Sequence, residues 1–235
     1  MKNLLLQIVI LILSLWNLNS ACAKDTFAND FGSWTEINFY APITEKVQTR
    51  FHIIPRLLDN ATDFNELGLH GLLGYKFNEY FSFYQGYAWN TLYIPNFTRE
   101  QRPYQEAIIS HEVDKLQFQH RIRFEERFLQ GVDGVSLRGR YRLKGTYPLD
   151  KNKKWSLVLF DELLINFNSP NDGPKAGINQ NRIYAGINRR LNENISADLG
   201  YQLQHRHFPG PATETLNHFI IFYLNYSLPT LVQNK

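Results

Sequence analysis

Charged side chains recur at every second position in the middle of the chain, and they are the strongest candidates for chemistry. The residues concerned are Arg121, Arg123, Glu125, Arg127, Arg138, Arg140, Arg142, Glu162 and Arg182, together with Glu36 and Asp198 nearer the two ends of the chain. A guanidinium group forms paired hydrogen bonds with a carboxylate or with another anion of similar shape. The set therefore has two interpretations. One is a network of Arg–Glu pairs that ties strands together, and the other is a basic constriction that binds or passes anions.

The two richest arginine segments predict one specific contact. Segments 115–129 and 135–147 are joined by the short connection 130–134, so we expect them to be antiparallel neighbours. Their basic rows then share one face, where like charges opposite one another repel. Carboxylates or bound anions must offset this repulsion, and Glu125 and Glu162 are the nearest acids. We therefore predict that Glu162 points to the same side and bonds to at least one of these arginines.

Histidines allow an enzymatic interpretation, because barrels that hydrolyse or transfer lipid acyl chains use His with Ser and an orienting polar group. The candidate residues are His205, His207, His218, Ser196, Ser227 and Asn217. No spacing singles them out. His205 and His207 also form an i, i+2 pair that a metal could use, but no third ligand is indicated. We assign no catalytic residue, metal or cofactor, and no phosphate-binding glycine motif is present.

The elements that carry these residues are predicted to be β-strands. In 116–128, LQFQHRIRFEERF, apolar and polar residues alternate with a period of two, which places them on opposite faces of a strand. Similar segments follow one another along the chain, at 31–40, 46–57, 65–77, 80–92, 104–113, 115–129, 135–147, 154–167, 179–190, 194–206 and 215–228. Single-chain bacterial barrels have an even number of strands. From these eleven segments we expect an all-β, antiparallel up-and-down transmembrane β-barrel of 10–12 strands, with 12 as the best estimate.

The first residues have the order of a secretory signal peptide. Lys2 precedes an apolar stretch that ends near Leu18, and Ala21-Cys22-Ala23 supplies the small residues of a cleavage site. We predict a signal peptide over 1–23 that is removed, and a barrel domain over 24–235. Cleavage would remove Cys22, the one cysteine of the chain, so the mature protein would have no thiol. The alternatives are an uncleaved transmembrane anchor, for which the apolar stretch is short, and a lipidated Cys22.

Composition and connections favour a barrel in a membrane. The chain has 235 residues, a mean hydropathy of −0.37 and no second apolar run of spanning length, and only helices and closed barrels satisfy their backbone groups in lipid. Short and longer connections alternate, as in outer-membrane barrels, and we assign the short ones to the periplasm. Aromatic residues such as Trp89, Tyr147 and Trp155 lie near strand ends, where interfacial girdles form. The alternative is a soluble barrel or sandwich with its apolar faces turned inward.

The segments also resemble a family of predicted outer-membrane barrels from Gram-negative bacteria, the domain of unknown function 2490. The resemblance rests on the order of short motifs, which are 30–34 (DFGSW), 120–128 (HRIRFEERF), 138–142 (RGRYR), 161–162 (DE), 181–186 (NRIYAG) and 199–201 (LGY). It covers roughly 30–228 and implies the fold and the location, with no activity attached. One departure is the tail 229–235, which follows the aromatic assembly sequence 226–228.

These observations predict an exported outer-membrane protein of a Gram-negative bacterium. We expect it to be a structural barrel or a small pore with an Arg/Glu-lined lumen. Its expected partners are outer-membrane lipid, the barrel-assembly machinery during biogenesis, and small anions. A net charge of +3 with intermixed signs gives no reason to expect a nucleic-acid partner. The alternatives are a lipid acyl hydrolase or transferase barrel and a soluble periplasmic ligand-binding β-protein.

Overall fold

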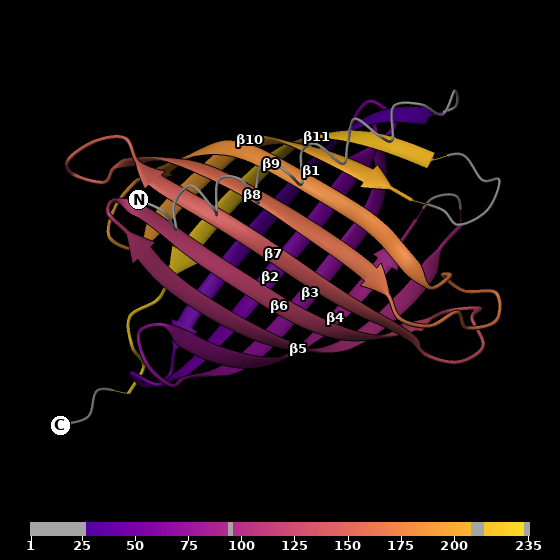
Figure 1. Ribbon diagram of the computed structural model, residues 1–235, viewed down its shortest axis with the longest axis horizontal. Coiled ribbons are helices and arrows are strands. Elements are labelled where there is room, and N and C mark those ends of the chain that lie inside the picture. The colour runs from indigo at the N-terminus through magenta and orange to yellow at the C-terminus, as the bar shows by residue number, and fades with distance from the viewer. Residues whose placement is uncertain (1–26, 94–95, 208–213, 233–235) are drawn as a thin grey trace.

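The computed structural model describes residues 27–93, 96–207 and 214–232, which form one closed β-barrel of eleven strands (Figure 1). The strands are β1 (Phe27–Pro42), β2 (Val47–Leu58), β3 (Asp63–Lys76), β4 (Phe81–Leu92), β5 (Thr98–Val113), β6 (Leu116–Leu129), β7 (Ser136–Pro148), β8 (Trp155–Asn166), β9 (Gly177–Arg190), β10 (Ile195–Arg206) and β11 (Glu214–Ser227). Among these described residues there is no helix of the length and apolarity needed to cross a membrane. The predicted signal peptide 1–23, including Cys22, lies outside them.

Strand pairing departs from the prediction at one seam. Strands consecutive in the chain pair antiparallel, and the barrel closes where β1 pairs with β11 in parallel, from Phe27 opposite Glu214 to Tyr40 opposite Ser227. An odd number of alternating strands leaves the first and the last running in the same direction, so their pairing must be parallel. The number of strands lies within the expected range of 10–12, but the best estimate of 12 was wrong, and so was the expectation of a wholly antiparallel sheet. All eleven predicted segments are strands, and the rule of even numbers does not hold in this chain.

The alternation of side chains places charge inside the barrel and apolar groups outside. Within β6, Arg123 and Glu125 are 6% and 0% exposed, whereas Ile122 before them and Phe128 after them, on the other face of the strand, are 52% and 47% exposed. Other strands repeat the pattern, and their exposed apolar residues include Phe51, Leu73, Phe83, Tyr87, Ile109, Tyr141, Ile187, Leu199 and Ile220. A soluble β-barrel has the opposite distribution, with an apolar interior and a polar surface.

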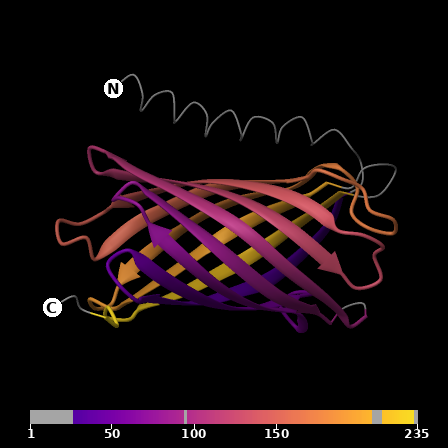
Figure 2. The same ribbon diagram turned by 90° about the horizontal axis from the view of Figure 1, so that it is seen from below.

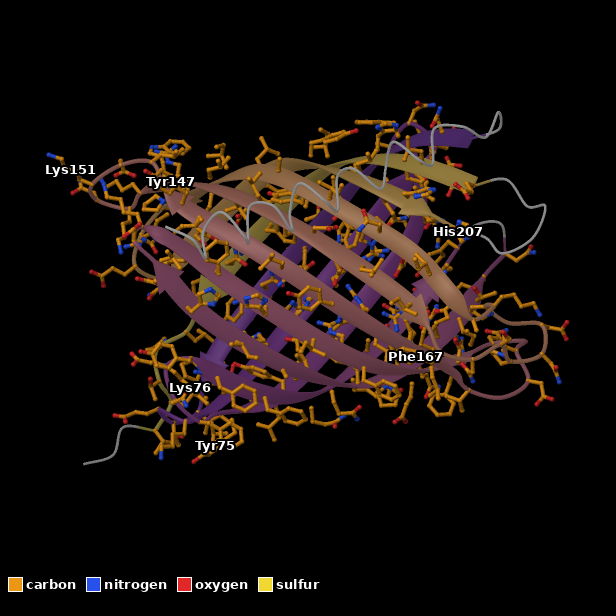
Figure 3. All side chains as sticks on the ribbon, viewed as in Figure 1. Tyr75, Lys76, Tyr147, Lys151, Phe167 and His207 are labelled. Atoms are coloured by element: carbon orange, nitrogen blue, oxygen red, sulfur yellow. The ribbon has the colours of Figure 1, made fainter. Side chains whose placement is uncertain are left out.

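The strands cross the barrel obliquely (Figure 2), and the connections at one mouth are on average shorter than those at the other. One mouth, the turn end, carries the connections 43–46, 77–80, 114–115, 149–154 and 191–194. The other, the loop end, carries 59–62, 130–135 and 167–176, and it is the end at which β4 and β10 finish and β5 and β11 begin. Figure 3 shows Tyr75, Lys76, Tyr147 and Lys151 at the turn end, with Phe167 and His207 at the loop end. Each mouth therefore presents aromatic side chains beside charged ones.

Glycines let large tyrosines lie flat inside the barrel. Tyr104 is 0% exposed and its ring lies against the backbone of Gly86, where a Cβ would overlap the ring. Tyr184 covers Gly200 in the same way. Gly in a strand often marks such a close approach. These pairs fill the interior without displacing the charged side chains beside them.

Candidate functional site

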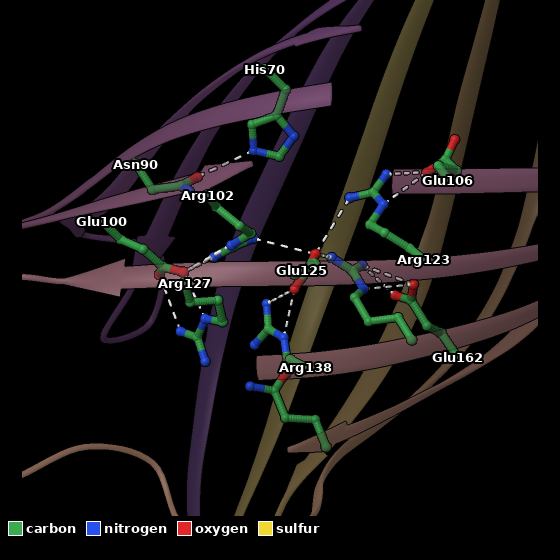
Figure 4. Close-up of polar contacts among 12 residues, drawn as sticks. His70, Asn90, Glu100, Arg102, Glu106, Arg123, Glu125, Arg127, Arg138 and Glu162 are labelled. Atoms are coloured by element: carbon green, nitrogen blue, oxygen red, sulfur yellow. Dashed lines mark hydrogen bonds and ion pairs between the residues drawn. The ribbon is translucent and has the colours of Figure 1, made fainter. Parts of the chain in front are cut away.

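A cluster of buried and half-buried arginines covers one side of the barrel interior, on β5, β6 and β7. We call it the arginine wall, and it consists of Arg102, Arg121, Arg123, Arg127, Arg138, Arg140 and Arg142. Glu125 lies at its centre (Figure 4). Its carboxylate is 2.6 Å from Arg138 and 2.9 Å from Arg140, and 3.7 Å from both Arg102 and Arg123. One buried carboxylate thus serves four guanidinium groups.

Two glutamates of β5 form ion pairs with arginines of this wall. Glu106 accepts hydrogen bonds from Nε and Nη2 of Arg123, at 2.8 Å and 2.5 Å. Glu100 accepts from Nε of Arg127 at 2.6 Å and lies 2.7 Å from Arg102. Both glutamates are at most 3% exposed. Buried charges need such pairing, since a lone buried ion costs several kcal/mol.

Glu162 of β8 supports the wall from the other side, which confirms the contact predicted from the sequence. It accepts hydrogen bonds from Arg140 at 2.8 Å and from Arg121, and Arg182 of β9 lies 3.5 Å away. The pairing of β6 with β7 sets Arg121 opposite Arg142 and Arg123 opposite Arg140. Glutamates from the flanking strands therefore separate like charges that the register brings together.

Three residues predicted to belong to the network have other partners. Arg142 donates to Gln119 at 3.4 Å and lies over the Phe160 ring at 5.4 Å. Glu36 is 3.1 Å from His52. Asp198 lies towards the turn end, where Asn188 and Asn225 donate to it at 2.9 Å and 3.1 Å. The predicted residues thus form one main cluster with smaller groups beside it.

A cavity of about 830 Å³ occupies the loop-end half of the interior, and side chains of all eleven strands line it. We call it the vestibule. Its lining reaches Lys175 and His207 at the loop end and Arg142 and Tyr223 in the middle of the barrel. The basic lining residues are the whole arginine wall with Arg56, Arg182, Arg206 and Lys175. The acidic ones are Glu36, Glu66, Glu100 and Glu162. Even when Glu106 and Glu125, which pair with the arginine wall, are counted as well, basic residues clearly outnumber acidic ones around the vestibule.

A second cavity of about 660 Å³ lies at the turn end and shares no lining residue with the vestibule. Gln119 and Lys144 line it, so the hydrogen bond from Arg142 to Gln119 lies where the two cavities approach each other. On the opposite side, Arg50 donates to the Tyr84 hydroxyl at 2.5 Å and packs over its ring at 3.9 Å. The two cavities therefore have separate linings.

The structure separates His205 from Ser196, two of the candidates for acyl-transfer chemistry. His205 lies opposite Leu216 near the loop end, whereas Ser196 lies opposite Asn225 near the turn end. His205 and His207 both contact Glu214 at 2.8 Å, a residue that the sequence analysis missed because it lies beyond a loop. Across 27–93, 96–207 and 214–232, no three His, Cys, Asp or Glu side chains are grouped to hold a metal ion.

Two further features of the interior were not predicted. The first is the inward face of β5, which carries Glu100, Arg102 and Glu106. The outward face of the same strand carries Arg99, Gln101 and Gln105, so both faces are polar and the sequence does not show which one points inward. Opposite the arginine wall, apolar side chains of β1, β2 and β11 line the vestibule. We call this the aromatic wall, and it consists of Trp34, Ile54, Phe219 and Tyr223.

Fold and site together define a β-barrel protein with an odd number of strands and an ionic interior. Comparison with known proteins places it in a family: residues 31–215 match the family described as "Protein of unknown function (DUF2490)", and the chain belongs to that family. An uncharacterized protein of Methylorubrum extorquens is 26% identical over 177 residues, which cover 73% of this chain and 72% of that protein. No solved structure matches the chain.

Proposed function

We propose that this protein is an outer-membrane β-barrel of a Gram-negative bacterium whose vestibule binds anions. The observation that carries the proposal is the inverted distribution of side chains, with ion pairs buried inside and apolar residues on the outer face. In water such an outer face would be an extensive exposed apolar surface. In a bilayer it contacts hydrocarbon, and a closed barrel leaves no unpaired strand edge.

Cell fractionation tests the membrane location. We expect the protein in the outer-membrane fraction, soluble only with detergent, and migrating faster on a gel when it is not boiled. Insertion would then use the barrel-assembly machinery, with the loop end outside. Recovery from the periplasm without detergent would overturn the proposal and favour a soluble ligand-binding β-protein. An intact mass measured on the same sample tests removal of residues 1–23.

A charge on the outer face gives a second test. Leu159 precedes the buried Phe160 on β8 and therefore faces outward. Leu159→Arg should lower the free energy of unfolding in lipid by about 2–4 kcal/mol if the residue lies at the bilayer midplane. The same substitution on a solvated surface costs little, so an unchanged unfolding curve in vesicles would contradict the membrane assignment. Leu149→Arg, in the exposed turn 149–154, is the matched control.

The excess of positive charge in the vestibule supports anion binding. Glutamates neutralise part of the arginine wall, and the remaining cations need either water or anionic ligands. Inorganic phosphate tests the binding without further assumptions. Added phosphate should raise the midpoint of thermal unfolding, with sodium chloride at matched ionic strength as the control, because a ligand of the folded state stabilises it. Equal effects of the two salts would contradict specific binding.

A small anion pore is the second candidate, favoured by the turn-end cavity on the far side of the Arg142–Gln119 contact. Planar-bilayer recordings separate the two functions. A binding barrel with a divided interior gives little steady current, whereas a pore gives a current whose reversal potential shows anion preference. The double variant Arg142→Ala, Gln119→Ala removes the divider at this point and should raise the conductance.

A further inference from the structure

The vestibule has two chemically different sides, which limits what it can hold. In the closed ring of strands, β1 lies opposite β6 and β7, so the aromatic wall faces the arginine wall across the cavity. Trp34 and Phe219 are 5% and 3% exposed and pack edge to face, with ring centroids 6.0 Å apart. A ligand in this space meets apolar carbon on one side and guanidinium groups on the other.

Trp34 has both aromatic and guanidinium neighbours. The guanidinium of Arg56 is 3.5 Å from the centroid of its ring, and that of Arg182 is 5.0 Å away. Both arginines line the vestibule. A cation over an indole ring is stabilised by the ring quadrupole, which orients it without using its N–H donors. The arrangement leaves hydrogen-bonding capacity for a ligand.

Buried donors along the lining lack partners. Within the described chain, no hydrogen bond is made by Nε of Arg121, Arg142 or Arg182, or by the indole N–H of Trp34. Arg182 is 6% exposed. An unpaired buried donor costs about 1–3 kcal/mol, so these groups favour a ligand that accepts hydrogen bonds. The predominance of N–H donors specifies an anion, not a cation.

We infer that the vestibule binds an amphipathic organic anion, a molecule with an acidic group and an apolar or aromatic body; this inference rests on the proposed anion binding. The acidic group accepts hydrogen bonds from Arg142 and Arg182, and the body packs along the aromatic wall as a whole, including Tyr223. A cavity of about 830 Å³ is within the range of small-molecule sites. An inorganic anion leaves the aromatic wall without contact, and a neutral apolar molecule leaves the arginine donors unpaired.

Calorimetric titration of the full-length protein, purified from membranes in a non-ionic detergent, tests the inference with three matched probes. Naphthalene-2-carboxylate carries ring and charge, naphthalene-2-methanol carries the ring alone, and acetate carries the charge alone. Heats of titration into detergent without protein are subtracted. We expect the carboxylate with the ring to bind at least tenfold more tightly than either of the other two.

Two variants locate the site. Arg182→Gln should weaken binding of naphthalene-2-carboxylate by about tenfold or more, since a hydrogen bond to a charged group contributes that much to affinity. Trp34→Phe should weaken it less and leave acetate unaffected. Lys144→Gln is the control, because it removes an interior cation that lines the other cavity. Faster gel migration without boiling shows that each variant is folded.

The outcomes separate this inference from the function on which it rests. Equal affinity for acetate and naphthalene-2-carboxylate would overturn the amphipathic ligand and leave anion binding in place. Equal affinity for the alcohol and the carboxylate would contradict the role of the arginines. Absence of binding by all three, in a folded protein that phosphate also fails to stabilise, would overturn both proposals. An equal loss in Lys144→Gln and Arg182→Gln would place the site outside the vestibule.

Discussion

The arginine wall and the aromatic wall face each other inside one barrel, yet they are stabilised by different forces. On the arginine wall, the pairing of β6 with β7 sets arginines opposite arginines, and glutamates from β5, β6 and β8 keep them together. On the aromatic wall, Trp34, Ile54 and Phe219 belong to a packed apolar cluster beside the parallel seam. The arginine wall depends on ion pairs with buried glutamates, and the aromatic wall depends on the packing of its apolar side chains. Each can therefore be disturbed without directly altering the other.

Removing the central carboxylate should have the largest effect. Glu125→Gln keeps the shape of the side chain but leaves Arg102, Arg123, Arg138 and Arg140 without the acid they share. We expect the free energy of unfolding to fall by about 3–5 kcal/mol, as for a broken buried ion pair. Urea unfolding in detergent micelles measures it. Glu126→Gln, at the adjacent outward position, is the control and should change the free energy of unfolding little. Similar losses of stability in the two variants would contradict the central role of Glu125.

Truncation on the opposite wall should cost slightly less. Phe219→Ala opens a cavity beside Trp34, and we expect a loss of about 3 kcal/mol, at the lower end for such substitutions. The same urea titration measures it. The double variant with Glu125→Gln sharpens the comparison, because distant sites add their effects. A double loss far from the sum of the single losses would show that the two walls are coupled.

A smaller effect is expected where a tyrosine covers a glycine. Gly86→Ala places a methyl group against the Tyr104 ring, next to the arginine wall, and overpacking of this kind costs about 1–3 kcal/mol. Gly71→Ala is the matched control, because nothing lies within 4 Å of a Cβ at that position. Its stability should stay equal to the wild type or rise slightly. If both variants behave alike, the close contact of Tyr104 has no energetic weight.

The smallest effect is expected from a carboxylate outside both walls. Asp150 lies in the turn between β7 and β8, where the backbone N–H groups of Trp155 and Asn152 donate to it at 2.7 Å and 3.1 Å. The N–H of Trp155, above all, lowers its pKa below the usual 3.8. Its contribution to stability is therefore present above about pH 4 and is lost as the pH falls through the lowered pKa. The small deficit of Asp150→Asn at pH 7 should decrease when unfolding curves are measured at progressively lower pH; a deficit that is unchanged at pH 2 would contradict this.

Local alternation was enough to predict one wall and not the other. On β6, apolar and charged residues alternate sharply, so the inward direction of Arg123 and the contact of Glu162 followed from the sequence. On β11, apolar residues occupy both faces, as in Phe219-Ile220-Ile221-Phe222, and no contrast marks the side that faces inward. The pairing of β1 with β11 joins residues about 187 positions apart, which no local pattern reports.

The parallel seam also has a consequence for the two ends of the barrel chain. Because β1 and β11 run in the same direction, the first residue of β1, Phe27, lies at the loop end, and the last residue of β11, Ser227, lies at the turn end. In a barrel with an even number of strands both would lie at one mouth. If the barrel spans a membrane as proposed, an epitope inserted before Phe27 is on the opposite side from one fused after Ser227. Antibody labelling of intact cells would then detect the first and miss the second, so the sides of the chain ends show whether the number of strands is odd or even.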